Sequence, residues 1–420
     1  MEQMILTLIA ALLVTSAASI QENSTVTPVI LIPGICGSQI DGWYVKDSAP
    51  HYYCQKDSGG WTLLWLCIDC MIPPTISCWI DTFKLDISDV KNIKNRAGVQ
   101  TKVNDFGYTD GIGYLDEHHF VVQFEKLIVG LEKLPGYQRG ISIRGAPYDF
   151  RYTPNTKVGQ QYMIKLRYLI EETYELNGNT RVVLVAHSMG NPVTVRFLKS
   201  VTEEWKEKYI EGYVALAGVF GGAAKAIRSL LSGETEGMPQ IIVDPLTMRE
   251  FERTSPSVYW LLPNPQLFGD TPFVFSHDRN YSAHDYKALF EDVDIPQGPE
   301  MYDFIKDLPQ FDREIGVDVY CIHGKDQETP FQFQYGDNSK FPDNQPTTLS
   351  GDGDGTVNIQ SLELCKEFTT LRDYKTVTGF LATHLEILQR KDVIQYIADL
   401  LTKKNLKKNN DIGRKGDLVF

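Results

Sequence analysis

Positive charge is scarce in this sequence of 420 residues. Its 41 Lys and Arg residues stand against 54 Asp and Glu residues, which gives a formal net charge of −13. An acidic surface repels the phosphates of nucleic acids, so we expect no nucleic-acid partner. The same surface loses repulsion as the pH falls and carboxylates become protonated, which suits an acidic compartment.

Apolar runs long enough to span a membrane are also missing. The mean hydropathy of −0.23 argues against a protein with many membrane spans. The uninterrupted run of apolar and small residues from Met4 to Ala18 ends at Ala17, Ala18 and Ser19 and is short for a spanning helix. We therefore interpret residues 1–19 as a cleaved signal peptide. Entry into the secretory pathway predicts glycosylation at the sequons of Asn23 and Asn280, and a final location in the lysosome or outside the cell.

A zinc site lacks the residues it needs. Cys67 and Cys70 have the spacing of two zinc ligands, but no second pair of Cys or His follows at ligand spacing. Seven cysteines in an exported chain instead predict disulfides, with at least one thiol left over. We expect neither a metal nor another cofactor.

Short apolar runs alternate with helical patterns, which predicts an α/β fold with a parallel sheet. The length of the chain fits one elaborated domain over residues 20–402. We expect strands at residues 28–32, 181–185, 213–216 and 317–322, and helices at residues 165–176, 189–200 and 392–401.

Three segments do not fit this alternation. Residues 223–309 are long and irregular, with many Pro and aromatic residues, and we expect them to form a cap or lid over the sheet. Trp61 to Trp79 is apolar without a clear period, and Pro73-Pro74 prevents one continuous helix, so we expect no sheet strand there. The Lys-rich residues 403–420 are expected to form a basic, flexible tail.

The motif Ala186-His187-Ser188-Met189-Gly190 lies between a predicted strand and a predicted helix. A serine nucleophile of an α/β-hydrolase occupies such a sharp turn, and small residues two positions away let the helix and the strand pass closely. A serine that only caps an ordinary helix does not account for these small neighbours. The motif therefore predicts an α/β-hydrolase fold with Ser188 as the nucleophile.

The two catalytic partners of Ser188 follow it in the sequence. In an α/β-hydrolase the acid comes before the histidine. His384 is the predicted base, and Asp354 in the Gly-rich loop of residues 351–357 is the predicted acid. Asp352, two residues earlier, remains an alternative acid. The backbone amides of Ile35 and Met189 are expected to form the oxyanion hole. The loop does not match a calcium-binding EF-hand, because later ligands are out of register.

Five longer motifs appear in a fixed order along the chain. They are Pro33-Gly34-x-x-Gly37-Ser38-Gln39, Cys78-Trp79-Ile80-Asp81, Arg144-Gly145-Ala146-Pro147-Tyr148-Asp149, Ala186-His187-Ser188-Met189-Gly190-Asn191 and Gly351-Asp352-Gly353-Asp354-Gly355-Thr356-Val357-Asn358. With these motifs the chain resembles the lecithin-cholesterol acyltransferase family, from about Pro28 to the last predicted helix. The resemblance implies release of a fatty acyl group from phospholipid and its transfer to water or a lipid alcohol.

The resemblance also implies two disulfides, Cys54 with Cys78 and Cys321 with Cys365. In the family the first closes a loop that touches the membrane, here near residues 50–85. The apolar residues expected to enter lipid are Trp61, Leu63, Leu64, Trp65 and Leu66. Without the resemblance, burial of these residues in the core is an equally good interpretation. The pairing of Cys36, Cys67 and Cys70 stays open.

The resemblance and the triad together predict a serine phospholipase A with O-acyltransferase capacity. A phosphatidylcholine-sterol O-acyltransferase is the alternative enzyme, and an inactive lipid-binding protein is the alternative of another class. The expected partners are a phospholipid membrane or lipoprotein surface and a lipid alcohol acceptor, with no obligate protein partner. Lys225 is our candidate for contact with the substrate headgroup. The family's lysosomal branch carries Asp at the position of Ile35, so headgroup and pH preference stay open.

Overall fold

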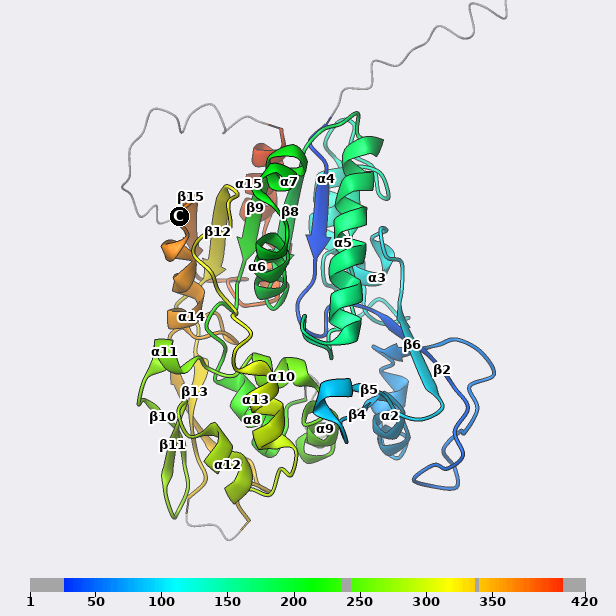
Figure 1. Cartoon of the computed structure of the whole chain (residues 1–420), viewed down its shortest axis with the longest axis vertical. Coiled ribbons are helices and arrows are strands. Elements are labelled where there is room, and N and C mark those ends of the chain that lie inside the picture. Colours follow the sequence, from blue (N-terminus) through cyan, green and yellow to red (C-terminus); the bar gives the residue numbers. More distant parts are fainter. Residues whose placement is uncertain (1–25, 236–242, 337–339, 403–420) are drawn as a thin grey trace, which may run out of the picture.

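Six parallel strands form the central sheet (Figure 1), in the order β15-β12-β9-β8-β1-β7. Each neighbouring pair is parallel. The computed structural model describes residues 26–235, 243–336 and 340–402. The strands are β1 (Val29–Ile32), β7 (Ile143–Gly145), β8 (Val182–His187), β9 (Ile210–Leu216), β12 (Val319–Gly324) and β15 (Leu371–Val377).

The strands expected at residues 28–32, 181–185, 213–216 and 317–322 all lie in this sheet, which confirms those predictions. Every residue of β1, β8 and β12 is buried. Continuous apolar runs are typical of parallel strands because helices cover both faces of the sheet.

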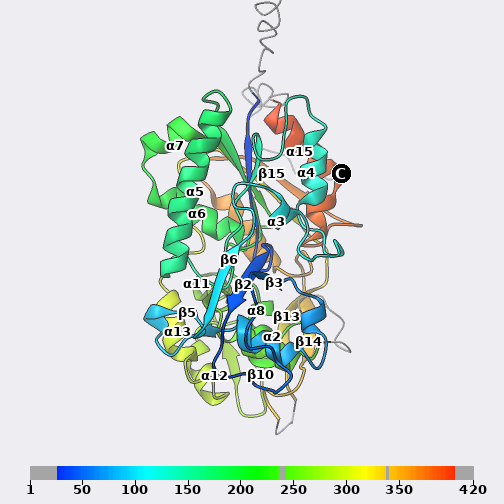
Figure 2. The same cartoon turned by 90° about the vertical axis from the view of Figure 1, so that its right-hand side faces the viewer.

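Helices cover the two faces of the sheet, as Figure 2 shows. One face carries α5 (Lys157–Leu176), α6 (Gly190–Ser200) and α7 (Glu203–Tyr209), and the other carries α4 (Glu125–Glu132) and α15 (Lys391–Leu401). The α5 helix begins eight residues before the predicted start at residue 165, because Thr156 caps it by accepting a hydrogen bond from the amide of Gly159. Within the described residues, no helix has the length and apolarity that a membrane span needs.

The segment expected to form a cap lies outside the central sheet, beyond the carboxyl ends of its strands (Figure 1). Two of its strands join two later strands in a second sheet of order β11-β10-β13-β14. Its role as a cap stays a prediction. The elements of this region are α8 (Lys225–Ser232), α9 (Pro245–Glu252), α10 (Pro256–Trp260), α11 (Pro265–Phe268), β10 (Pro272–Phe275), β11 (Asn280–Ser282), α12 (Tyr286–Asp292), α13 (Gly298–Ile305), β13 (Thr329–Gln334) and β14 (Thr347–Gly351).

A third sheet corrects one prediction. Thr62–Trp65 forms β3, which pairs with β2 (Ile40–Tyr44) in an antiparallel sheet that also contains β6 (Val99–Val103). The expectation of no sheet strand within residues 61–79 was therefore wrong. The strand lacks an alternating pattern because Leu63, Leu64 and Trp65 are all buried.

Several short elements connect these sheets. Among them, α2 (Ile76–Phe83) begins just after Pro73-Pro74, which agrees with the expected interruption there. The others are η1 (Asp69–Met71), β4 (Leu85–Asp86), η2 (Val90–Asn92), β5 (Lys94–Asn95), α3 (Asp110–Gly113), α14 (Ile359–Glu363), η3 (Leu364–Glu367) and η4 (Glu386–Gln389).

Three disulfides cross-link the chain. Cys54 is bonded to Cys78 and Cys321 to Cys365, the two pairs that the family resemblance implies. Cys67 is bonded to Cys70, and Cys36 is the one cysteine outside these bonds. The Cys321–Cys365 bond joins β12 to η3 and closes the loop that carries Asp354.

Removing the Cys321–Cys365 bond is expected to cost far more stability than removing the Cys67–Cys70 bond. The bonded residues are 44 positions apart in the first case and 3 in the second. By loop-closure entropy the double Ala variants lose about 4 and about 1.5 kcal/mol of unfolding free energy. Urea unfolding of both variants measures the difference, and equal losses would contradict this account.

Candidate active site

Ser188 occupies a sharp turn between β8 and α6. Its φ of 55° is in the left-handed region, which a non-glycine residue adopts only when its surroundings hold it there. Gly190 packs so closely on β1 that a Cβ atom would lie 2.6 Å from the carbonyl oxygen of Ile32. The small residue at this position therefore allows the sharp turn, as the motif predicts.

His384 brings together the predicted nucleophile and the predicted acid. Its Nε2 lies 2.8 Å from Ser188 Oγ, and its Nδ1 lies 2.7 Å from Asp354 Oδ2. In the resting arrangement the serine hydroxyl donates to Nε2, while Nδ1–H donates to the carboxylate. Asp354 is fully buried, and Ser188 and His384 are nearly so. The arrangement is that of a serine hydrolase in which the histidine accepts the serine proton.

The geometry distinguishes Asp354 from Asp352. The second oxygen of Asp354, Oδ1, accepts hydrogen bonds from the amides of Thr356 and Val357, which leaves Oδ2 aimed at His384. Asp352 Oδ1 instead accepts from the amides of Asp326 and Gly353. Asp352 is exposed and serves to hold the loop, so the structure favours Asp354 as the acid.

The loop after β1 approaches the nucleophile directly. A Cβ atom on Gly34 would lie 2.5 Å from Ser188 Cβ and 3.1 Å from its Oγ. Ile35 follows at once, and Met189 is the residue after the nucleophile. Among the described residues, neither of these two amides has a hydrogen-bond acceptor. Both are thus available to an oxyanion, although their catalytic role stays a prediction.

The residues expected to enter lipid are mostly part of the core. Leu63 is 9% exposed, Leu64 4%, Trp65 2% and Leu66 7%, whereas Trp61 is 40% exposed. The prediction of membrane contact is therefore wrong for these four buried residues in this structure, because they pack inside the protein. Only Trp61 keeps a surface position.

Trp65 has a different neighbourhood from the one expected. Its ring packs among Phe83, Phe150 and Phe251. Its Nε1–H donates to the carbonyl oxygen of Cys36 at 2.8 Å, in the loop that carries the predicted oxyanion amide. The side chain therefore supports the active-site loop rather than a lipid contact.

The remaining predicted residues lie elsewhere. Lys225 begins α8, and its Nζ lies 3.9 Å from Glu234 Oε2. Asn280 is exposed at the start of β11, while Asn23 and the predicted signal peptide and tail lie outside the described residues.

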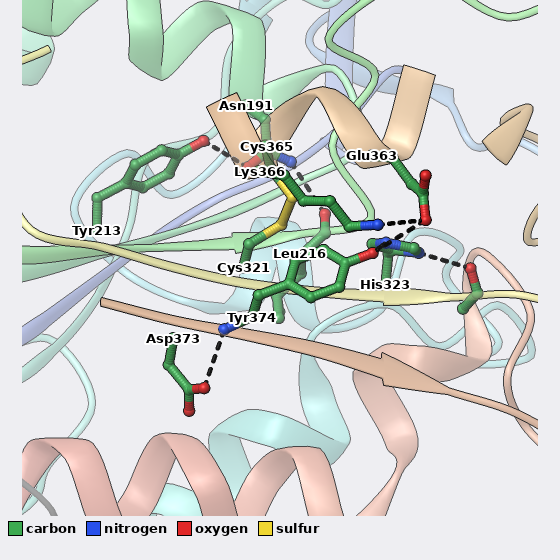
Figure 3. Close-up of a disulfide and its surroundings, with 11 residues drawn as sticks. Asn191, Tyr213, Leu216, Cys321, His323, Glu363, Cys365, Lys366, Asp373 and Tyr374 are labelled. Carbon is green, nitrogen blue, oxygen red and sulfur yellow. Dashed lines mark hydrogen bonds and ion pairs between the residues drawn. A yellow bond between two sulfur atoms is a disulfide. The ribbon is translucent and has the colours of Figure 1, made fainter. Parts of the chain in front are cut away.

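A buried pair behind the nucleophile was not foreseen (Figure 3). Asn191 Nδ2 donates to the carbonyl oxygens of Ser188 and Leu216. Tyr213 donates its hydroxyl proton to Asn191 Oδ1 at 2.6 Å, and Figure 3 shows this bond and the one to Leu216. These bonds tie the Ser188 turn to the neighbouring strand β9. Asn191 belongs to the serine motif of residues 186–191. No sequence pattern pointed to Tyr213, because its contact depends on how β8 and β9 pair.

His323 is a buried histidine that lies across the Cys321–Cys365 disulfide from Tyr213 (Figure 3). His323 Nδ1–H donates to the carbonyl oxygen of Gly324, and Tyr374 donates to Nε2 at 2.7 Å. Burial lowers the pKa of His323 from its usual value, which favours the neutral ring. Gly324 packs directly against Asp354, with a Cβ position 3.2 Å from the Cβ of the acid.

Comparison with known proteins extends these observations. The family model for lecithin:cholesterol acyltransferase matches residues 61–307 and 302–391. A human protein named lysosomal phospholipase A and acyltransferase is 36% identical over 384 residues, covering 89% of this chain and 90% of that protein. The Arabidopsis thaliana lecithin-cholesterol acyltransferase-like 1 is 36% identical over 380 residues, covering 85% and 87%. The Gallus gallus phosphatidylcholine-sterol acyltransferase is 31% identical over 383 residues, covering 90% and 89%.

The similarity to solved structures concerns the fold alone. A chain from the crystal structure of the Tle4–Tli4 complex matches with a TM-score of 0.53 at 14% identity, covering 92% of this chain and 99% of that one. This likeness, the parallel sheet and the serine turn after β8 confirm the predicted α/β-hydrolase fold.

Replacing Gly34 by Ala is expected to abolish reaction at Ser188 without unfolding the protein. The added methyl group would collide with the Ser188 side chain. Labelling by a fluorophosphonate, followed as an increase in intact mass, should fall at least about 100-fold because the nucleophile is displaced. Gly351→Ala is the control, since a Cβ there meets only ordinary contacts at 3.5 Å or more. Equal labelling of both variants would contradict the close approach.

Proposed function

The chain belongs to the lecithin:cholesterol acyltransferase family, and from this premise we propose that it is a serine phospholipase A with O-acyltransferase capacity. The observation that carries the proposal is the continuous hydrogen-bonded arrangement of Ser188, His384 and Asp354. An inactive lipid-binding protein has no need of this arrangement, so an enzyme is favoured.

The proposed reaction has two halves. Ser188 Oγ attacks the ester carbonyl of a glycerophospholipid while His384 Nε2 accepts its proton, and the amides of Ile35 and Met189 bind the oxyanion. The tetrahedral intermediate then expels the lysophospholipid, which takes the proton from His384. Water or a lipid alcohol next loses a proton to His384 and attacks the acyl-enzyme, which releases a fatty acid or a new ester and restores Ser188.

The setting proposed for this reaction is the secretory pathway. Disulfides form in that compartment, and the chain has three of them. The name of the human relative favours the lysosome as the final location, with secretion as the alternative. We retain Trp61 as a contact with the lipid surface and Asn23 and Asn280 as glycosylation sites.

Product analysis tests the proposed reaction. The purified protein is incubated with vesicles of phosphatidylcholine that is labelled in one acyl chain. Three reactions are compared, one with added ceramide, one with an added sterol and one without an acceptor. We expect labelled free fatty acid without an acceptor, and an acylated alcohol at its expense with one. Ser188→Ala should lower both products by at least about 10³-fold, because the nucleophile is lost. Product only with the sterol would favour the sterol acyltransferase, and no product would overturn the proposal.

We also propose that Lys225 contacts the substrate phosphate. Lys225 and Arg228 of α8 both face the carboxylate of Glu234, just after the helix, which leaves two positive side chains against one negative one beyond the carboxyl ends of the sheet. Lys225→Ala is expected to raise KM for phospholipid roughly tenfold to a hundredfold, as for a charge-assisted hydrogen bond of about 1.5–3 kcal/mol. Lys287→Ala, which removes an exposed ion pair with Asp303, is the control. Unchanged KM values on anionic and zwitterionic vesicles would exclude the contact.

A further inference from the structure

His187 is a buried histidine beside the nucleophile for which the reaction above has no use. It is the last residue of β8 and is 2% exposed. Its Nε2 lies 2.7 Å from the backbone carbonyl oxygen of His384, and the two imidazole rings are 4.8 Å apart. The strand that presents the nucleophile is therefore bonded directly to the backbone of the base.

The hydrogen-bond acceptor determines which ring nitrogen of His187 carries the hydrogen. A carbonyl oxygen only accepts, so Nε2 carries the hydrogen and donates it. Burial and the neighbouring His384 ring lower the pKa of His187 to about 3. The ring is therefore a neutral donor at acidic and at neutral pH.

Neutrality matters because His384 gains a positive charge during each half of the reaction. A second cation 4.8 Å away in a buried site would oppose that charge. A neutral imidazole supplies the hydrogen bond without this repulsion. Lys or Arg at position 187 would supply a donor together with the unfavourable charge.

The bond to His187 completes the support of the base. The amide of His384 donates to the carbonyl oxygen of Asp354 at 2.8 Å, so both polar groups of its backbone are held. Its ring is held by Asp354 and by Ser188. The Ser188 hydroxyl bond is lost when the serine carries an acyl group, whereas the His187 bond does not involve any reacting atom.

We propose that His187 is a positioning residue that keeps His384 at its working distance from residue 188 through both halves of the reaction. This inference rests on the proposed function, in which His384 must deprotonate first the serine and then water or an alcohol. Displacement of a catalytic group by about 1 Å can cost about 100-fold in rate. Loss of the bond should therefore lower kcat and leave KM nearly unchanged, because substrate binding is not touched.

Three substitutions separate the hydrogen bond from the packing. In His187→Gln the amide nitrogen can reach the place of Nε2, in His187→Asn it reaches only the place of Nδ1, and in His187→Leu no donor remains. We expect kcat for phospholipid hydrolysis to fall about 10- to 100-fold in the Asn and Leu variants, with KM within about twofold. The Gln variant should stay within about threefold of the original kcat. Thermal unfolding of all three variants shows whether they are folded.

Fluorophosphonate labelling of Ser188 is measured on the same proteins, because it needs the base but no lipid. The same ranking, with Gln well above Asn and Leu, supports the positioning role even if phospholipid proves not to be the substrate. Equal labelling and equal kcat in the Gln, Asn and Leu variants would overturn it. It would also be overturned if all three variants lost activity in proportion to the fall in their unfolding temperatures. If the original protein is not labelled at Ser188, the proposed function and this inference both fail.

Discussion

The left-handed turn at Ser188 is the constraint on which the site depends. An isolated serine has no reason to adopt this conformation, so the surrounding structure must supply the energy that holds it. Its amide donates to Leu216 in the next strand, and Asn191 holds its carbonyl oxygen. Glycines at 34 and 190 let the backbone approach from two sides. The parallel sheet thus aims one hydroxyl at a base that lies 196 residues later in the sequence.

The small antiparallel sheet and the central sheet meet at the loop after β1. Trp65 from β3 supports this loop through the carbonyl oxygen of Cys36, and the backbone amide of Tyr148, just after β7, donates to Ser38 Oγ. Apolar residues that resemble a lipid-binding segment by composition therefore stabilise the geometry around the nucleophile. At the surface of the same sheet, Trp61 lies beside Trp43, with Lys102 over its ring.

Features that depend on residues close together in the sequence could be predicted correctly. The central strands have continuous apolar runs, and the serine motif stands between a strand and a helix, so both could be recognised from neighbouring residues. Asp352 and Asp354 could not be separated, because the choice depends on which carboxylate the fold turns toward His384. Burial of Leu64 and Trp65 was also hidden, since an apolar side chain suits a protein core and a lipid surface equally well. The bonds of His187 and Tyr213 join segments that only the folded sheet brings together.

The central claim is that Ser188 carries the acyl group between phospholipid and acceptor. Its most direct test is an acid quench of the reaction within the first turnover, followed by mass spectrometry of the peptides. The account predicts that the peptide containing Ser188 gains the mass of one fatty acyl group, and that this species disappears faster when a lipid alcohol is added. Turnover of phospholipid without any acylated Ser188 peptide, or with the acyl group on another residue, would contradict it.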